Sequence, residues 1–382
     1  MDFNKTVFEL CNENEKLREF LISKGFEPLK NDKLFKTMAK MIKLKDALKM
    51  KNIDRHIFME EFNNYNGVIL EDENIEKEGK KFIVEGAVPC PIRVPLMENL
   101  KEISDEKIKE VDFDLRSANL GLDFVTQKFK NKEKLPDLIT SAGFDLVLDE
   151  EIFEEIEKNY VAPSNEFNED FINRGADLKD PNGVFYMLGV VPCVFIVNKN
   201  ALGGRGIPKS WEELLSGEFN NKITIPVSDL DMYNAILVTL YSKFGLDGLR
   251  KLKDGFYSRM HPAQMVKQKN DSGACVSLCP YFFANMIKNE SLELVWPEDG
   301  AIISPIFMTA KKSSIDNLKE VIDYFTSQRI GEIFSFNGKF PSTNLRVDNN
   351  LRDDYKFLWA SWDLLNNKRE KMKKDISKVF EL

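Results

Sequence analysis

The sequence has no run of about 18 consecutive apolar residues, the length that a helix needs to cross a bilayer. Histidine is scarce as well, and neither His56 nor His261 stands in a context that supports a hydrolytic triad. Walker A and dinucleotide-binding fingerprints are also missing from the sequence. We therefore expect neither a membrane-spanning protein nor an enzyme of these classes.

Positive charge is in deficit, with a formal net charge of -8 across 382 residues. Binding to nucleic acid phosphates needs an organised basic surface, so we expect no nucleic-acid partner. The composition is 43% hydrophobic and 30% charged, which is enough apolar material for two or three compact units.

The first residues, MDFNKTVFELCNENEKLREFL, contain acidic groups and no uninterrupted apolar core. Neither a secretory signal nor a lipoprotein cleavage box precedes Cys11, so we expect a cytoplasmic location without direct membrane insertion. In that compartment the five cysteines, Cys11, Cys90, Cys193, Cys275 and Cys279, are expected to be reduced.

The chain divides near residue 78. Apolar residues recur at helical spacing over 7–21 and again over 35–48, which predicts a small helical bundle within residues 1–75. The charged segment EDENIEKEGK at 71–80 is typical of an exposed linker.

After the linker, short β-rich runs alternate with helical stretches. This pattern predicts an α/β fold whose mixed or parallel sheets are flanked by helices. In such sheets ligands bind at the carboxyl ends of strands. The runs are KFIVEGAV, VDFDLR, DLITSAGFDLV, GVVPCVFIV, KITIPV, ACVSL and AIISPIFMTA.

Several pieces of the chain, taken in their order and spacing, resemble type II solute-binding proteins, the relatives of ferric-iron, thiamine and polyamine receptors that serve ABC importers. The pieces are VNKN, IPKSW at 207–211, WPEDGA at 296–301 and FPSTN at 340–344. The resemblance covers roughly residues 81–345. The N-terminal bundle is similar to a small helical domain of unknown function that is sometimes fused to such proteins.

This resemblance implies a two-lobe hinged fold, a solute held between the lobes, and permease and ATPase subunits as partners. It implies no enzymatic activity. The lobes would be 76–190 plus 298–345 and 191–297, crossed near 190–197 and 292–296, with C-terminal helices over 346–382 packing on a lobe. The basic residues Lys368, Arg369, Lys371, Lys373 and Lys374 are expected to form a solvated helix face.

Ligand contacts are expected at four strand-end loops. In lobe one, Cys90 and Pro91 follow the first strand. Ser141 and Gly143 end a later strand, where small residues let a ligand approach the backbone amides as an anion cradle. Turn and cap chemistry is the alternative for Ser141.

In lobe two, Ser228, Asp231 and Tyr233 lie where a strand leads into a helix N-terminus. Asp231, like Asp229, is a candidate for a cationic ligand, with stabilisation of the helix dipole as the alternative. A second loop presents Cys279 and Tyr281. These loops predict a bound anion, metal or metal complex.

Three cysteines have proline neighbours, namely Cys90, Cys193 and Cys279. If they converge, their thiolates would bind a soft metal ion, the one cofactor that the sequence suggests. Buried structural cysteine is the alternative. Two other functions stay open: a cytoplasmic sensor or carrier with the same fold, and a thiol-dependent enzyme using Cys90 or Cys279.

Overall fold

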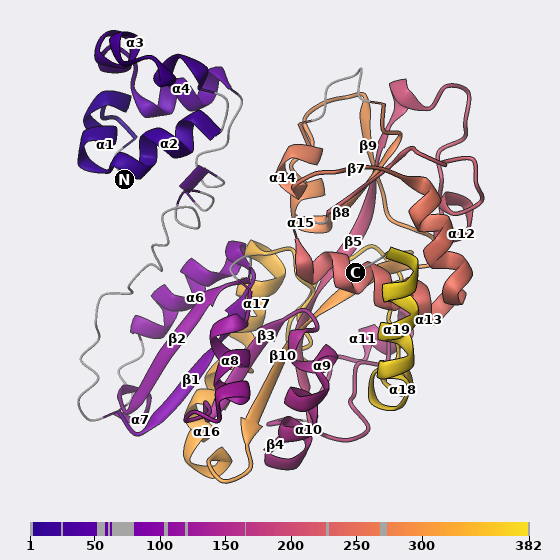
Figure 1. Cartoon of the computed structure of the whole chain (residues 1–382). Coiled ribbons are helices and arrows are strands. Elements are labelled where there is room, and N and C mark those ends of the chain that lie inside the picture. Colours follow the sequence, from indigo (N-terminus) through magenta and orange to yellow (C-terminus); the bar gives the residue numbers. More distant parts are fainter. Residues whose placement is uncertain are drawn as a thin grey trace. The chain divides into compact units, whose positions relative to one another are not determined.

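The computed structural model describes residues 3–23, 26–51, 58–59, 62, 80–102, 106–118, 121–164, 166–226, 229–267 and 273–380. The chain separates into two compact units, Met1–Lys77 and Glu78–Leu382 (Figure 1). We describe each unit by itself.

The N-terminal unit is helical. Its described elements are α1 (Val7–Glu13), α2 (Glu15–Ser23), η1 (Glu27–Lys30), α3 (Asp32–Thr37), η2 (Met38–Lys40) and α4 (Leu44–Met50). Helix α1 starts with a capping box, in which Thr6 and Glu9 satisfy each other's backbone amides. Leucine and phenylalanine side chains, including Leu17, Leu21 and Phe58, form the buried core of the unit. The predicted helical bundle is confirmed.

The C-terminal unit is built on one mixed sheet. The described strands are β1 (Phe82–Val88), β2 (Val111–Ser117), β3 (Leu138–Ala142), β4 (Tyr160–Val161), β5 (Tyr186–Asn198), β6 (Ile223–Ile225), β7 (Phe256–Arg259), β8 (Val276–Pro280), β9 (Leu292–Val295), β10 (Ala301–Lys311) and β11 (Phe357–Leu358). The main path runs β2-β1-β3-β10-β5-β8-β6-β7, with β4 and β11 on β10 and β9 on β5.

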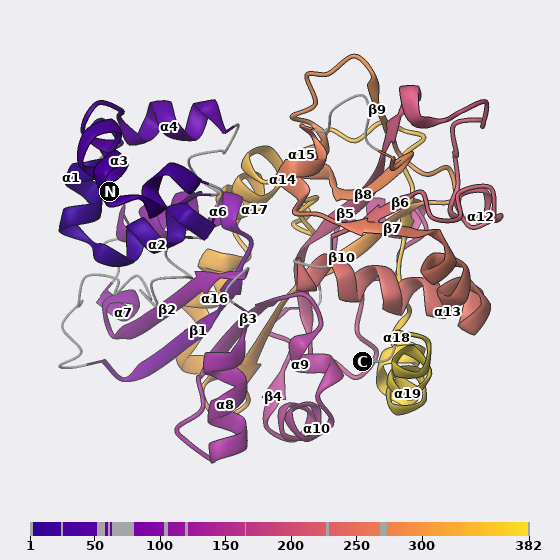
Figure 2. The ribbon, with the colours of Figure 1, turned by 45° about the horizontal axis from the view of Figure 1, so that its top comes forward.

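Helices surround the sheet, as Figures 1 and 2 show. They are α6 (Cys90–Glu102), α7 (Glu106–Lys109), α8 (Asp123–Asn131), α9 (Asp145–Leu148), α10 (Glu150–Asn159), α11 (Asp170–Asn173), η4 (Lys199–Ala201), α12 (Trp211–Leu214), α13 (Leu230–Gly255), α14 (Pro262–Met265), α15 (Tyr281–Ala284), η5 (Ile315–Leu318), α16 (Lys319–Phe325), α17 (Gln328–Glu332), η6 (Ile333–Asn337), α18 (Trp362–Asn367) and α19 (Arg369–Phe380).

Alternation along the strands places helices on both sheet faces. On β1, Val84 and Val88 belong to one buried cluster, together with Ile92 of α6, whereas Ala87 belongs to another that includes α9 and α10. Successive strand residues point to opposite faces, so β1 contributes to two cores. The predicted α/β class with flanking helices is confirmed.

Two long strands, β5 and β10, run through both halves of the sheet. We call the half with β1, β2 and β3 lobe one, and the half with β6, β7, β8 and β9 lobe two. Strand β10 pairs with β3 in lobe one and with β5 along most of its length. Near the start of β10, Ile302 pairs with Cys193 of β5, and Cys193 in turn pairs with Pro280 of β8 in lobe two. Near the crossing predicted at 292–296, β9 pairs with β5 within lobe two. The residue limits of the lobes stay a prediction.

The C-terminal helices pack on α13. Tyr241 of α13 donates a hydrogen bond to Asp375 of α19 at 2.8 Å. Arg369 departs from the predicted solvated face, since it is 8% exposed and its guanidinium lies 3.8 Å from the ring centre of Phe153. Its long side chain therefore anchors α19 through a cation–π contact.

Candidate functional site

The carboxyl ends of two strands point toward each other. Strand β3 reaches Ala142 opposite Ile306 of β10, while β8 reaches Pro280 opposite Cys193, which itself pairs with Ile302. The directions of pairing bring the two strand ends together from opposite sides. Along β10 the two ends are four residues apart, from Ile302 to Ile306, or about 13 Å at the usual strand rise. This meeting point of the lobes is the candidate site.

Gly143 lies directly against Asp231 at this point. Gly143 has φ +87°, and a β-carbon placed on it would lie 2.5 Å from Asp231 Oδ1. Its backbone amide donates a hydrogen bond to the carbonyl of Pro305 at 2.8 Å. In this arrangement the Gly143 amide is already hydrogen-bonded and the Asp231 carboxyl group lies beside it, so Gly143 offers no free amide to an anion, and the anion cradle at Ser141–Gly143 stays a prediction.

Ser141 and Ser304 belong to the same region. Ser141 is fully buried on β3, and its Oγ makes no hydrogen bond with any described residue. Ser304 on β10 donates its hydroxyl to the backbone carbonyl of Asp231 at 3.2 Å. Ser304 thus ties the start of α13 to a strand shared by both lobes.

Three carboxyl groups interact electrostatically here. Burial raises the pKa of Asp231 well above its usual range, and the nearby charges of Asp229 and Asp145 raise it further. Burial also raises the pKa of Asp229 to about 6, although a hydrogen bond from the Met232 amide acts in the opposite direction. Burial and the charge of Asp123 raise the pKa of Asp145. Asp229 and Asp231 come from lobe two and Asp145 from lobe one, so carboxyl groups of both lobes gather here, and the charge of one opposes ionisation of the next.

The three proline-flanked cysteines do not form one site. Cys90 is half-buried at the start of α6, and its sulfur lies 2.7 Å from the hydroxyl of Ser117. Cys193 and Cys279 are fully buried on neighbouring strands. Across the part of the chain that the structure describes, no group of three histidine, cysteine or acidic side chains is placed to hold a metal ion. The predicted three-cysteine metal site is therefore wrong.

Burial also makes the inner thiols poor nucleophiles. It raises the pKa of Cys193 and of Cys279, and the charge of Asp229 adds to both shifts. A thiol rather than a thiolate is present at neutral pH, because the charged form is desolvated. These two cysteines are structural core residues in this arrangement.

The other predicted residues that the structure describes make different contacts. Pro91 is the second residue of α6. Tyr233 packs edge-on against Phe380 of α19, and Tyr281 packs edge-on against Trp296 and Tyr355. Ser228 lies outside the residues that the structure describes. The structure therefore brings together Gly143 and Asp231 from the predicted set.

Comparison with known proteins now gives the family. The model of the bacterial extracellular solute-binding protein family matches residues 133–368. This chain belongs to that family. A second model, for a domain of unknown function (DUF1858), matches residues 1–59. No curated protein matches the chain.

Solved structures share the fold of this solute-binding protein. The ferric binding protein from Campylobacter jejuni is 15% identical with a TM-score of 0.58, and the match covers 78% of this chain and 99% of that one. The periplasmic binding protein AfuA from Actinobacillus pleuropneumoniae, solved with fructose-6-phosphate, is 14% identical with a TM-score of 0.57, covering 79% and 99%. An ABC transporter protein from Clostridium perfringens is 17% identical with a TM-score of 0.56, covering 78% and 99%. The two-lobe fold predicted from the resemblance is confirmed.

Aromatic rings add a second contact between the lobes of this solute-binding protein. Phe282 of α15, in lobe two, lies 6.2 Å from Phe340, which follows η6 in lobe one. The neighbouring Phe283 meets His261 edge-on. His261 accepts a hydrogen bond from the Ala263 amide and caps α14.

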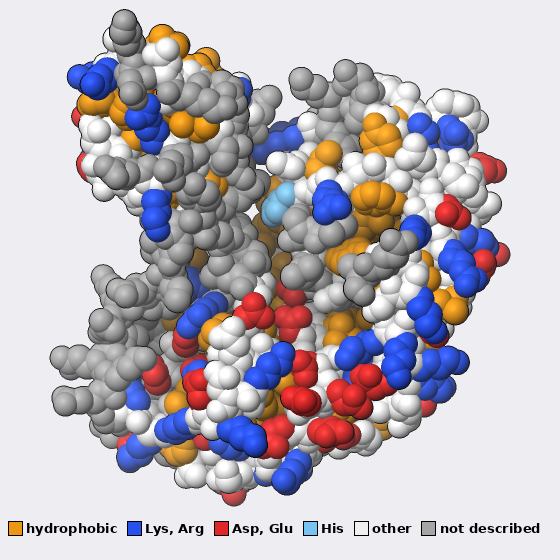
Figure 3. Space-filling view, in the orientation of Figure 1, with side chains coloured by type: hydrophobic (Ala, Val, Ile, Leu, Met, Phe, Trp, Pro, Cys, Tyr) orange, Lys and Arg blue, Asp and Glu red, His pale blue; other side chains and the backbone are white. Residues whose placement is uncertain are grey.

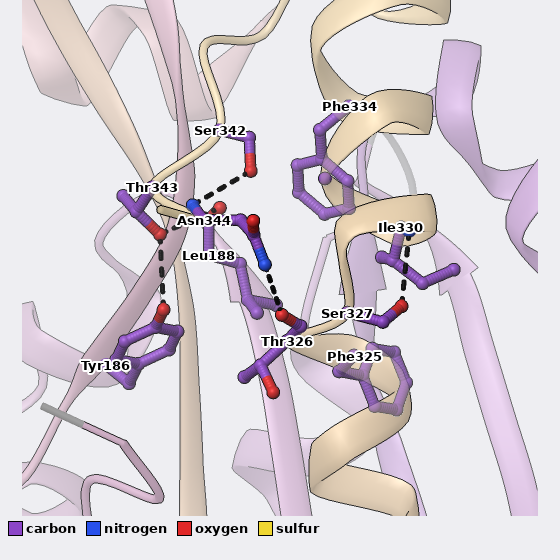
Figure 4. Close-up of a pocket in the computed structure, with 11 residues that line it drawn as sticks. Tyr186, Leu188, Phe325, Thr326, Ser327, Ile330, Phe334, Ser342, Thr343 and Asn344 are labelled. Carbon is purple, nitrogen blue, oxygen red and sulfur yellow. Dashed lines mark hydrogen bonds between the residues drawn. The ribbon is translucent and has the colours of Figure 1, made fainter. Parts of the chain in front are cut away.

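A small pocket lies within lobe one rather than at the meeting point of the lobes (Figure 4). Tyr186, Asn344 and Phe334 are among its lining residues, and it has room for about one water molecule. Asn344 donates a hydrogen bond to the Thr326 carbonyl at 2.6 Å across it. A space of this size holds no solute, so we do not place the binding site there.

Sequence reasoning missed three residues at the site. Asp145 follows the Ser141–Gly143 loop by two residues, so its position was a usable signal. Ser304 precedes Pro305 inside the apolar run AIISPIFMTA, where a polar residue beside a proline indicates an interruption. Nothing in the sequence pointed to Phe282, since a phenylalanine that follows a strand is ordinarily interpreted as a residue of the hydrophobic core.

The family of this protein is defined by solute binding rather than by catalysis. No helix among the described residues has both the length and the apolar composition required to cross a membrane.

Proposed function

We propose that this protein captures a small solute between its two lobes and delivers it to the permease and ATPase subunits of an ABC importer. The observation that carries the proposal is the approach of the β3 and β8 ends on β10, where Gly143 of lobe one meets Asp231 of lobe two. A solute that touches both lobes favours their closed arrangement by its greater affinity for that state. A permease can then distinguish the loaded form.

The carboxyl groups favour a cationic solute. Among the three predicted ligand classes, a free anion would meet repulsion from Asp145, Asp229 and Asp231. A cationic solute, such as a cationic metal complex, would neutralise them, whereas in this arrangement the three carboxyl groups are not placed as the ligands of a bare metal ion. The named cargo of the Campylobacter jejuni neighbour, ferric iron, supports the metal class, whereas fructose-6-phosphate in AfuA supports the anion class. We favour the cation because of the local charge.

A thiol-dependent enzyme that uses Cys279, one of its two candidate nucleophiles, is disfavoured by the burial of that residue. Cys279 is fully buried, and its pKa is raised by burial and by the charges of Cys193 and Asp229. A thiol with these neighbours is not activated at neutral pH.

A cytoplasmic sensor or carrier is the second candidate, and the N-terminal unit favours it. That unit has a core of its own and lies outside the region that matches the solute-binding family. It could couple solute capture to a partner other than a permease. Binding of the loaded protein to membranes that contain the cognate permease and ATPase separates this candidate from the importer role.

A thermal-shift panel tests the binding proposal. Divalent and trivalent metal ions, polyamines and phosphorylated sugars are added separately to the full chain, and hits are confirmed by calorimetry. We expect a cation to raise the melting temperature and Asp231→Asn to weaken its binding at least tenfold. The matched control is Asp247→Asn, because Asp247 lies on the same helix with its side chain 71% exposed. Stabilisation by an anion alone, unchanged in Asp231→Asn, would overturn the assignment of a cation.

A further inference from the structure

The middle of the N-terminal unit is unusually basic for this chain. Residues 34–51 contain six lysines and one aspartate, a net charge of +5 in a chain whose total is -8. The remaining residues therefore carry -13. We call residues 34–51 the basic segment, and it includes η2, α4 and most of α3.

Large apolar side chains protrude from the same segment. The exposed fractions are 39% for Leu34, 54% for Met38, 87% for Met41 and 77% for Met50. Helices α3 and α4 lie side by side in both ribbon views (Figures 1 and 2). Apolar and basic side chains also stand next to each other on the face of this unit seen in Figure 3.

These side chains are not required for the fold of the unit. The core uses other residues of the segment, such as Phe35, Leu44 and Leu48, which are at most 7% exposed. Within the described part of the chain, Lys36, Lys43 and Lys49 form no ion pair. The segment thus presents free positive charge and flexible apolar groups around a core that is already complete.

We propose that the basic segment binds the surface of an anionic lipid membrane, peripherally and without spanning it. Charge complementarity selects this occupant, because lysines near anionic headgroups gain attraction that adds from one residue to the next. Unbranched methionine side chains adapt to an irregular environment, and protruding ones can enter the interfacial layer of a bilayer.

Vesicle co-sedimentation with the full chain tests the proposal. We expect binding to phosphatidylglycerol vesicles and much weaker binding to phosphatidylcholine vesicles. Binding should fall steeply between about 0.1 M and about 1 M salt, because the Debye length shrinks from about 10 Å to about 3 Å. Equal binding to both lipids, or none to either, would overturn the proposal and leave an acidic protein surface as the occupant.

Two variants separate the charged from the apolar contribution. Replacing Lys36, Lys43 and Lys49 with glutamate should weaken binding by at least about tenfold, and Met38→Ser with Met41→Ser should weaken it by a few fold. The matched control replaces Lys368, Lys371 and Lys374 near and on α19 with glutamate, which makes the same change in net charge. Melting temperatures confirm that each variant is folded. If the control lost as much binding as the test variant, net charge rather than this segment would be responsible, and the proposal would fail.

Discussion

Gly143 of lobe one lies directly against Asp231 of lobe two at the candidate site. The glycine ends β3 with φ +87°, and there is no space for a β-carbon because Asp231 Oδ1 would be 2.5 Å away. Glycine is needed at this position both for its backbone conformation and for the close approach of the aspartate.

Gly143→Ala should separate the lobes and lower stability by about 1 to 3 kcal/mol, through the left-handed backbone and the overlap with Asp231. Chemical denaturation measures the change. Gly183→Ala is the matched control, since Gly183 also has positive φ (+63°) but nothing within 4 Å of a β-carbon. An equal loss in both variants would show that backbone strain alone matters and that the Asp231 contact contributes nothing.

Asp229→Asn should make the protein more stable at neutral pH. The folded-state pKa of Asp229, about 6, is above its ordinary value of 3.8. The native state therefore holds the proton more tightly than the unfolded state does, and the stability that this provides is lost as pH rises from about 4 to about 6. Two units of pKa correspond to about 2 to 3 kcal/mol. Asparagine keeps the helix cap and carries no charge.

Urea denaturation of both proteins between pH 4 and pH 8 checks this prediction. The variant should exceed the natural protein by up to about 2 to 3 kcal/mol at pH 7.5, and the difference should vanish near pH 4. The raised pKa values of Asp231 and Asp145 act in the same direction. A natural protein that is the more stable of the two at pH 7.5 would contradict the charge cluster.

The sequence allowed the strands to be placed, but not the meeting of their ends. The apolar pattern located β1, β3, β5 and β10, because each strand is a continuous apolar run and helical segments separate one run from the next along the chain. Which residues meet depends on register, and the Ala142–Ile306 and Cys193–Ile302 pairs join positions more than 100 residues apart. Local patterns contain no information on such pairs.

The cysteines show the same limit. Their proline neighbours correctly indicated strand ends and helix starts, yet convergence was inferred from loop position alone. Cys193 and Cys279 point into the core, because strand alternation and burial decide direction. Cys90 remained half-buried because it begins a helix after the strand has ended.

Thiol labelling of the native protein at pH 8 should modify one cysteine rapidly, and that residue should be Cys90. It is half-buried, whereas the other four are buried. Burial raises the pKa of Cys11 to about 12, with the charge of Arg18 opposing it, so little thiolate forms there. Cys90→Ser should remove the rapid phase, and denaturant should restore four modifiable thiols. Rapid modification that persists in Cys90→Ser would show that an inner thiol is accessible.

Phe282→Ala should loosen the aromatic contact that joins the lobes. The ring lies 6.2 Å from Phe340 across the site and 5.1 Å from Phe283 on its own side. Removing the Phe282 ring removes its contact with Phe340 of lobe one, and the loss of this aromatic pair should lower the free energy of unfolding by about 1 kcal/mol. Hydrogen exchange should therefore become faster in peptides covering 281–287 and 338–344 together. Phe336→Ala is the control, because that ring is 46% exposed. Faster exchange on one side only would mean that Phe282 packs within its own lobe and does not couple the two.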